Sequence, residues 1–128
     1  MQMTEASFSG QTPIDGYGPG FFRIAGAVRR GAQLVYGAGA VDWGGFEDLA
    51  AIRALVGRID VLFVGMGADI AFPPADFIAA VEEMGLMPEP MSSPSAARSY
   101  NVLLTEGRRV AVALLPMPGD LPPELARD

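Results

Sequence analysis

An unbroken apolar run at residues 61–64, Val-Leu-Phe-Val, constrains the fold more than any other feature of the sequence. A strand with one face in water alternates apolar and polar side chains, whereas a continuous run is typical of a strand buried on both faces. A chain of 128 residues can build one domain with such a core and little else. The run therefore predicts a single α/β domain.

The segments around this run have helical periodicity. Apolar residues recur at helical spacing over residues 46–56 and 74–84, and a glycine follows each segment. A third helix is predicted over residues 93–106, because Ser93-Pro94 joins an N-cap residue to a proline suited to the first turn. Residues 109–115 then form a last apolar strand.

The N-terminal third is rich in glycine and extended. Turn formers fill residues 13–20, and extended pieces follow at 21–25, 28–36 and 37–43, the second with its turn near Arg30-Gly31. Two prolines in residues 86–91 predict a strand at a sheet edge. We therefore expect a central mixed β-sheet with helices packed on it, built from an N-terminal β meander followed by alternating helix and strand.

These elements suggest simple domain bounds. Residues 13–116 are expected to form the α/β domain, between a disordered N-terminus over residues 1–12 and a mobile C-terminal tail over residues 117–128. The start of the chain has neither a basic segment nor an apolar run, and no window has the length of a membrane span. The expected location is the cytoplasm, and peripheral contact with the inner face of the cytoplasmic membrane stays open.

The missing residue types close several classes of chemistry. The sequence has no cysteine and no histidine, and all nine of its basic residues are arginine. Thiolate nucleophiles, histidine general bases and Schiff-base lysines are therefore excluded, and we expect no metal, no cofactor and no catalytic residue. A net charge of −6 argues against nucleic-acid binding. Arg29-Arg30 and Arg108-Arg109 are interpreted as solvated charges.

Two segments are candidates for a ligand pocket. Gly65 and Gly67 follow the buried strand at the end where α/β sheets collect ligands, although glycines also permit a tight strand exit. Ser92, Ser93 and Ser95 begin the third helix, whose N-terminus attracts anions. Arg98 lies one turn further, and Asn101 on the same helix is the last candidate for this pocket. The alternative is that the serines only cap the helix and Arg98 pairs with Asp15 or Asp60.

Four segments together resemble one family. They are residues 14–21 (IDGYGPGF), 65–67 (GMG), 95–103 (SAARSYNVL) and 106–110 (EGRRV). The combination is similar to the domain-of-unknown-function 498 family of bacteria and archaea, which includes the mitochondrial respiratory complex I assembly factor 3. The similarity extends over about residues 8–116. Two positions depart from the family pattern: Ala97 replaces a common cysteine, and Met66 a common threonine.

The resemblance implies a compact α/β fold and a non-catalytic protein that binds a partner, either a membrane-complex subunit or a second assembly factor. The family segment supplies candidate contact or structural residues, namely Asp15, Gly16, Tyr17, Gly18, Phe21 and Tyr100. Asn101, inside a predicted helix, is expected to hold a backbone loop such as residues 16–20. The alternative function is a small anionic-ligand-binding protein, or an enzyme, with a pocket at Gly65, Gly67 and the helix start. The oligomeric state stays open.

Overall fold

The computed structural model describes residues 10–126 and contains two sheets and four helices in that range. The first sheet is an antiparallel meander of β1 (Ile14–Gly18), β2 (Phe21–Ile24) and β3 (Ala27–Arg30). The second has five strands in the order β5-β4-β8-β6-β7. Their bounds are Gln33–Tyr36 for β4, Gly39–Asp42 for β5, Val61–Met66 for β6, Pro88–Met91 for β7 and Val110–Leu115 for β8.

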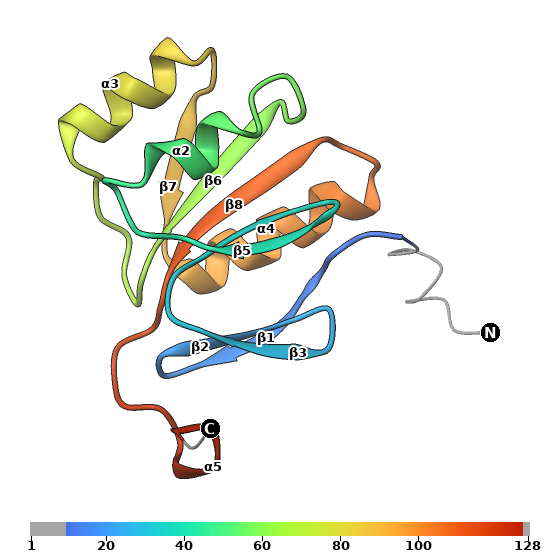
Figure 1. The fold of residues 1–128 in the computed structure, drawn as a ribbon, viewed down its shortest axis with the longest axis vertical. Helices are drawn as coiled ribbons and strands as arrows, with labels where there is room; N and C mark the ends of the chain where they lie inside the picture. The colour runs from blue at the N-terminus through green and yellow to red at the C-terminus, as the bar shows by residue number, and fades with distance from the viewer. Residues whose placement is uncertain (1–9, 127–128) are drawn as a thin grey trace.

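The five-stranded sheet is mixed, as predicted. β6 runs parallel to both β7 and β8, whereas β4 is antiparallel to β5 and β8. The helices α2 (Leu49–Arg53) and α3 (Ala75–Glu83) cover one face of this sheet, while α4 (Ser93–Thr105) covers the other (Figure 1). The short α5 (Pro123–Ala126) lies beyond β8. The predicted fold class is therefore confirmed.

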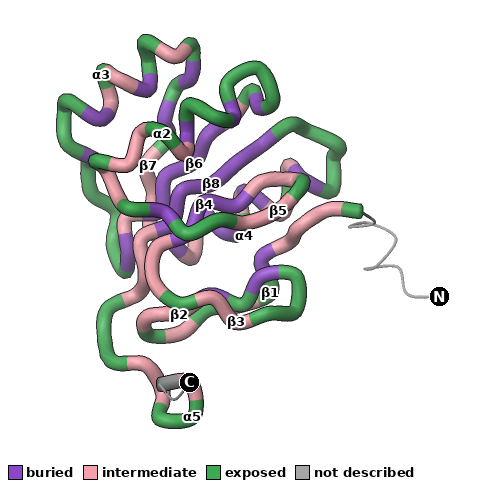
Figure 2. The backbone as a smooth tube through the Cα atoms, viewed as in Figure 1, coloured by how far each residue is buried: buried purple, intermediate pink, exposed green. Residues whose placement is uncertain are grey.

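Residues 61–64 are buried from both sides, because a separate core lies on each face of the five-stranded sheet. Phe63 points into the core beneath α4 and the three-stranded sheet, whereas Leu62 and Val64 point into the core beneath α2 and α3. β8 alternates in the same way, with Val112 on the first side and Ala113 on the second. Figure 2 shows the resulting buried stripe through β4, β6 and β8.

Two sequence-based expectations were wrong. Residues 28–36 do not form a hairpin, because β3 belongs to the first sheet and β4 to the second. The chain changes sheets at Gly31, whose φ is +77°. The predicted helix over 46–56 is also shorter: Asp48 caps it and Arg53 ends it. Phe46 lies outside the helix, where its ring packs edge-on against Trp43 and Phe77.

A buried glutamine holds the sheet change in place. Gln33 is fully buried, and its Nε2 donates to the Arg30 carbonyl at 3.0 Å and to Asp42 Oδ1 at 2.8 Å. Its Oε1 accepts from Nε of Arg29, which also lies 3.4 Å from Asp42. Arg29 is thus part of a hydrogen-bonded network that links the two sheets, and the prediction of a purely solvated charge was wrong for this residue.

Both ends of the chain were expected to lie outside the domain. Most of the N-terminal segment, residues 1–9, is outside the described range, as are residues 127–128. Thr12 is described, and its hydroxyl donates to the Gly37 carbonyl at 3.2 Å. At the other end, the Met117 carbonyl accepts from the Gly20 amide at 3.0 Å. Disorder and mobility of these segments stay predictions.

Candidate functional site

The two segments predicted to form a ligand pocket pack directly against each other. The Gly67 amide donates to Ser93 Oγ at 2.9 Å, and the same hydroxyl donates to the Leu115 carbonyl at 2.6 Å. The Ser93 amide in turn donates to the Gly67 carbonyl at 2.7 Å. A Cβ on Gly65 would lie 2.7 Å from Ser93 Oγ. Protein atoms therefore fill the junction between the β6 exit and the start of α4.

The start of α4 is capped by a serine one residue earlier than the predicted Ser93, and its amides are engaged. Ser92 is the N-cap residue, and its Oγ accepts from the Ser95 amide at 3.3 Å. The Ala96 amide donates to the Ser92 carbonyl at 2.8 Å. These bonds and the Ser93 contact occupy the groups that would attract an anion. The alternative function, an anion pocket at these segments, is not supported.

A second junction ties β1 to α4. Asn101 Oδ1 accepts from the Ile14 amide at 3.0 Å, and its Nδ2 donates to the Ile14 carbonyl at 2.7 Å. Tyr100 is fully buried, and its hydroxyl donates to the Thr12 carbonyl at 2.7 Å. Burial raises the pKa of Tyr100 well above its ordinary value. Asn101 thus holds backbone, as expected, but at the start of β1 and not at the turn over residues 16–20.

Next to this junction lies an open groove of about 250 Å³, which we call the β1–α4 groove. Tyr17 and Val102 stand half-exposed, at 48% and 50%. Arg98 is exposed, and within residues 10–126 it has no ion pair, so the predicted pairing with Asp15 or Asp60 was wrong. The groove is lined by Ile14, Asp15, Gly16, Tyr17, Pro94, Ala97, Arg98, Asn101 and Val102.

The structure therefore divides the candidate residues into two groups. Asp15, Gly16, Tyr17, Arg98 and Asn101 line one groove, and Gly65, Gly67 and Ser93 lie in the packed junction at the other side of α4's first turn. Tyr100 belongs to the junction between β1 and α4, through its bond to Thr12.

Gly18 and Phe21 face each other across the β1–β2 turn. A Cβ on Gly18 would overlap the Phe21 ring, so a side chain there would require the ring to move. Asp15 Oδ2 accepts from the Gly26 amide at 2.7 Å, which fastens the β2–β3 turn to β1. Sequence reasoning missed Val102 as a groove residue. The available signal was an aliphatic side chain on the face of α4 opposite the buried Ala96 and Tyr100.

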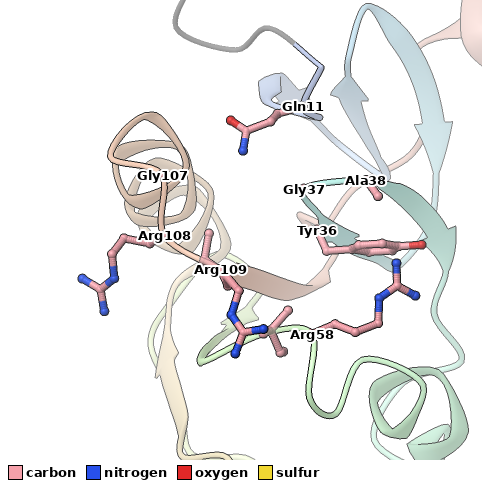
Figure 3. A pocket seen from close by; sticks show the side chains of 10 residues that line it. Gln11, Tyr36, Gly37, Ala38, Arg58, Gly107, Arg108 and Arg109 are labelled. Atoms are coloured by element: carbon pink, nitrogen blue, oxygen red, sulfur yellow. The ribbon is translucent and has the colours of Figure 1, made fainter.

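Arg58, Arg108 and Arg109 line a separate cavity of about 200 Å³ beside Tyr36 (Figure 3). Arg109 forms a two-pronged ion pair with Asp60, at 2.7 and 3.0 Å, and Arg58 lies over the Tyr36 ring at 5.7 Å. The Arg109 guanidinium lowers the pKa of Asp60, and the carboxylate raises the pKa of Arg109. Asp60 and Tyr36 thus already engage two of the three cations.

Among residues 10–126, no group of three carboxylate, histidine or cysteine side chains could hold a metal ion. In the same range, none of the helices combines the length and the apolar content that crossing a bilayer requires.

The fold defines a small α/β domain in which the segments around Gly67 and Ser93 serve its packing. A family model described as "Protein of unknown function (DUF498/DUF598)" matches residues 14–115. The chain belongs to this family, as its sequence segments predicted.

Relatives of the chain occur in bacteria and in animals. An uncharacterised protein of Rhodobacter capsulatus is 61% identical, over 95% of this chain and 98% of the relative. The NADH dehydrogenase [ubiquinone] 1 alpha subcomplex assembly factor 3 of Danio rerio is 29% identical, over 86% of this chain and 67% of the relative. A crystal structure described as an outer membrane protein from Bartonella henselae has a TM-score of 0.75 and 32% identity, and it covers 84% of this chain and 97% of that one.

Proposed function

We propose that the protein is a non-catalytic assembly factor for a membrane-bound complex of the NADH:quinone oxidoreductase type. The observation that carries the proposal is the similarity to the animal assembly factor over 86% of the chain. The sequence also has no cysteine, histidine or lysine, the side chains on which most acid–base and covalent catalysis depends. The protein would act in the cytoplasm or at the inner face of the cytoplasmic membrane.

The β1–α4 groove is the proposed contact surface. Half-exposed Tyr17 and Val102 offer apolar area, and aromatic side chains contribute strongly to protein interfaces. Arg98 lines the same groove and has no ion pair among the described residues, so it is available to a carboxylate of the partner. The partner segment would therefore present an apolar side chain next to an acidic one. A subunit of the membrane complex or a second assembly factor would supply it.

The test is a tagged pull-down from gently solubilised membranes of the native host, with bound proteins identified by mass spectrometry. We expect subunits of the NADH:quinone oxidoreductase or an assembly partner to be enriched with the unaltered protein. A Tyr17→Ala/Val102→Ala variant should lose that enrichment. The matched control is Val41→Ala/Val56→Ala, which removes comparable exposed apolar groups elsewhere.

Either of two results would contradict the proposal. If the unaltered protein enriches no subunit or assembly partner over an untagged control, the assembly role loses its support. If both double variants retain the partner equally, the groove is not the contact surface.

A further inference from the structure

A pocket of about 420 Å³ lies between the loop before α2 and the start of α3. These two helices cover the face of the five-stranded sheet opposite α4 (Figure 1). We call this cavity the α2–α3 pocket. Its walls combine aromatic rings with two carboxylates. The lining residues are Gly44, Phe46, Glu47, Pro74, Asp76 and Phe77.

The aromatic part of the pocket is continuous with the core. Phe46 and Phe77 have ring centroids 5.0 Å apart, and Trp43 contacts both rings at 5.6 and 6.1 Å. Trp43 and Phe77 are buried, whereas Phe46 is partly open to the pocket. Such an edge-to-face arrangement fixes the ring planes before any ligand arrives.

The polar part of the pocket is acidic. Glu47 and Asp76 are exposed, and neither has a hydrogen bond or ion pair within residues 10–126. One wall of the pocket, Pro74 to Phe77, belongs to a stretch over residues 59–97 that has six acidic side chains and no basic one. Aromatic faces and carboxylates both attract a guanidinium or ammonium group. The chemistry of the pocket is that of a cation site.

The loop before α3 indicates that the ligand is larger than a free cation. Phe72 is 87% exposed and Ile70 is 70% exposed, and they lie only two and four residues before Pro74 of the pocket wall. Two large exposed apolar side chains within one short loop favour an interaction surface. A small cation would leave them in water, whereas a peptide segment could cover them.

We propose that the α2–α3 pocket receives an arginine or lysine side chain from a basic, apolar-flanked segment of a protein partner. Charge complementarity identifies the partner: the pocket and its loop carry Glu47, Asp69 and Asp76 on a chain with a net charge of −6. This surface lies on the opposite face of the five-stranded sheet from the β1–α4 groove. The protein would thus hold one partner segment on each face.

The test uses the full chain and three defined probes. They are the blocked tripeptide acetyl-Leu-Arg-Leu-amide, its citrulline analogue, which has the same shape without the charge, and acetyl-arginine-amide alone. Amide resonances in two-dimensional NMR and the fluorescence of Trp43, the sole tryptophan, follow binding. We expect the arginine tripeptide to shift residues 44–48 and 74–77 saturably, and the citrulline tripeptide to leave them unchanged.

Charge variants assign the effect to the pocket. Glu47→Gln/Asp76→Asn should weaken the arginine tripeptide about tenfold or more, since each change removes an ionic partner of the guanidinium. Glu82→Gln/Glu83→Gln removes the same charge from the exposed end of α3 and should change the affinity much less. Equal losses in the two variants would overturn the assignment to the pocket.

The apolar contact is tested separately. Ile70→Ser/Phe72→Ser should lower the affinity for the tripeptide to that for acetyl-arginine-amide. If acetyl-arginine-amide binds the unaltered protein as tightly as the tripeptide, the pocket is a small-cation site and the proposal of a protein segment fails. If no probe shifts the pocket, the proposal fails entirely. Neither failure bears on the β1–α4 groove, whose own pull-down remains decisive for the proposed assembly role.

Discussion

The side-chain amide of Asn101 binds both backbone groups of Ile14, through bonds of 3.0 Å to its N–H and 2.7 Å to its carbonyl. An amide side chain carries one acceptor and one donor group on neighbouring atoms, so it can pair with a strand residue as another strand would. This pairing attaches the edge of the three-stranded sheet to α4. Both residues also line the β1–α4 groove.

Replacing Asn101 by aspartate should therefore loosen β1. The carboxylate can still accept from the Ile14 amide, but it cannot donate to the Ile14 carbonyl. We expect a loss of about 1–3 kcal/mol in the free energy of unfolding, measured by urea denaturation. Hydrogen exchange of the β1 amides should accelerate. Val102→Asp, which adds the same charge to the exposed side of α4, is the control, and an equal loss there would count against the mechanism.

Gly65 should not tolerate a side chain. A Cβ at this position would lie 2.7 Å from Ser93 Oγ and 2.9 Å from Ser93 Cα, and the Cα cannot turn away. Gly65→Ala should cost about 1–3 kcal/mol through overpacking. Gly16→Ala is the matched control, since a Cβ there has no atom within 4 Å. Thermal unfolding of both variants separates the two cases, and a stable Gly65→Ala variant would disprove the close packing.

Ser93 should matter more to stability than its neighbour Ser92. Ser93→Ala leaves the Gly67 amide and the Leu115 carbonyl without their buried partner, at a cost of about 1–3 kcal/mol. Ser92→Ala removes a single cap bond of 3.3 Å, near the lower end of the range of about 0.5–2 kcal/mol. Urea denaturation of both variants measures the order, and the reverse order would be inconsistent with the packed junction.

Tyr100 should make the protein sensitive to alkali. Burial raises the pKa of Tyr100 in the folded state, so the phenol stays neutral there. In the unfolded chain the phenol has its ordinary pKa of 10.0 and ionises above that pH. The stabilisation is complete below pH 10 and is lost as the pH rises beyond it, by about 1.4 kcal/mol per pH unit. With no cysteine or lysine in the chain, tyrosine is the only side-chain type that titrates near this pH.

The check on Tyr100 is a series of unfolding curves from pH 8 to pH 11. Tyr100→Phe should lower stability at neutral pH, because the bond to Thr12 is lost, yet give a flatter profile at high pH. Tyr17→Phe, at an exposed position, should keep the slope of the unaltered protein. Parallel profiles for all three proteins would rule out the buried phenol as the cause.

Asp60 should make the folding stability depend on pH under acidic conditions. Arg109 holds its pKa below the ordinary value of 3.8, so the stabilisation is present above that value and disappears as the pH falls through the folded-state pKa. Asp60→Asn should remove this part of the acid dependence. Asp69→Asn, in the exposed loop before α3, is the control. The free energy of unfolding of both variants is measured from pH 2 to pH 5. The same pH dependence in the two variants would contradict the prediction.

The sequence predicted the features that depend on neighbouring residues. The start of α4 is local, because the Ser92 cap and Pro94 act within one turn, and it was predicted within a residue. The two-sided burial of β6 is also visible in its own residues, since no polar side chain interrupts the run.

The features that the sequence did not reveal depend on distant contacts. The change of sheet at Gly31 relies on Gln33 meeting Asp42, and a two-residue link looks the same in a hairpin. The β6–α4 junction joins Gly67 to Ser93 across 26 residues, so glycine and serine segments that resemble a ligand site proved to be packing. The α2–α3 pocket was missed because Phe46 was assigned to a helix that begins three residues later.

β7 ends the five-stranded sheet, and two of its four residues are Pro88 and Pro90. Proline has no N–H, and in a sheet it is accommodated where its nitrogen faces the open edge. A strand arriving from another molecule would find carbonyl acceptors along this rim but no donors at either proline. Growth of the sheet by addition of further strands is thereby blocked on this side, which protects a chain with so apolar an interior from forming fibres.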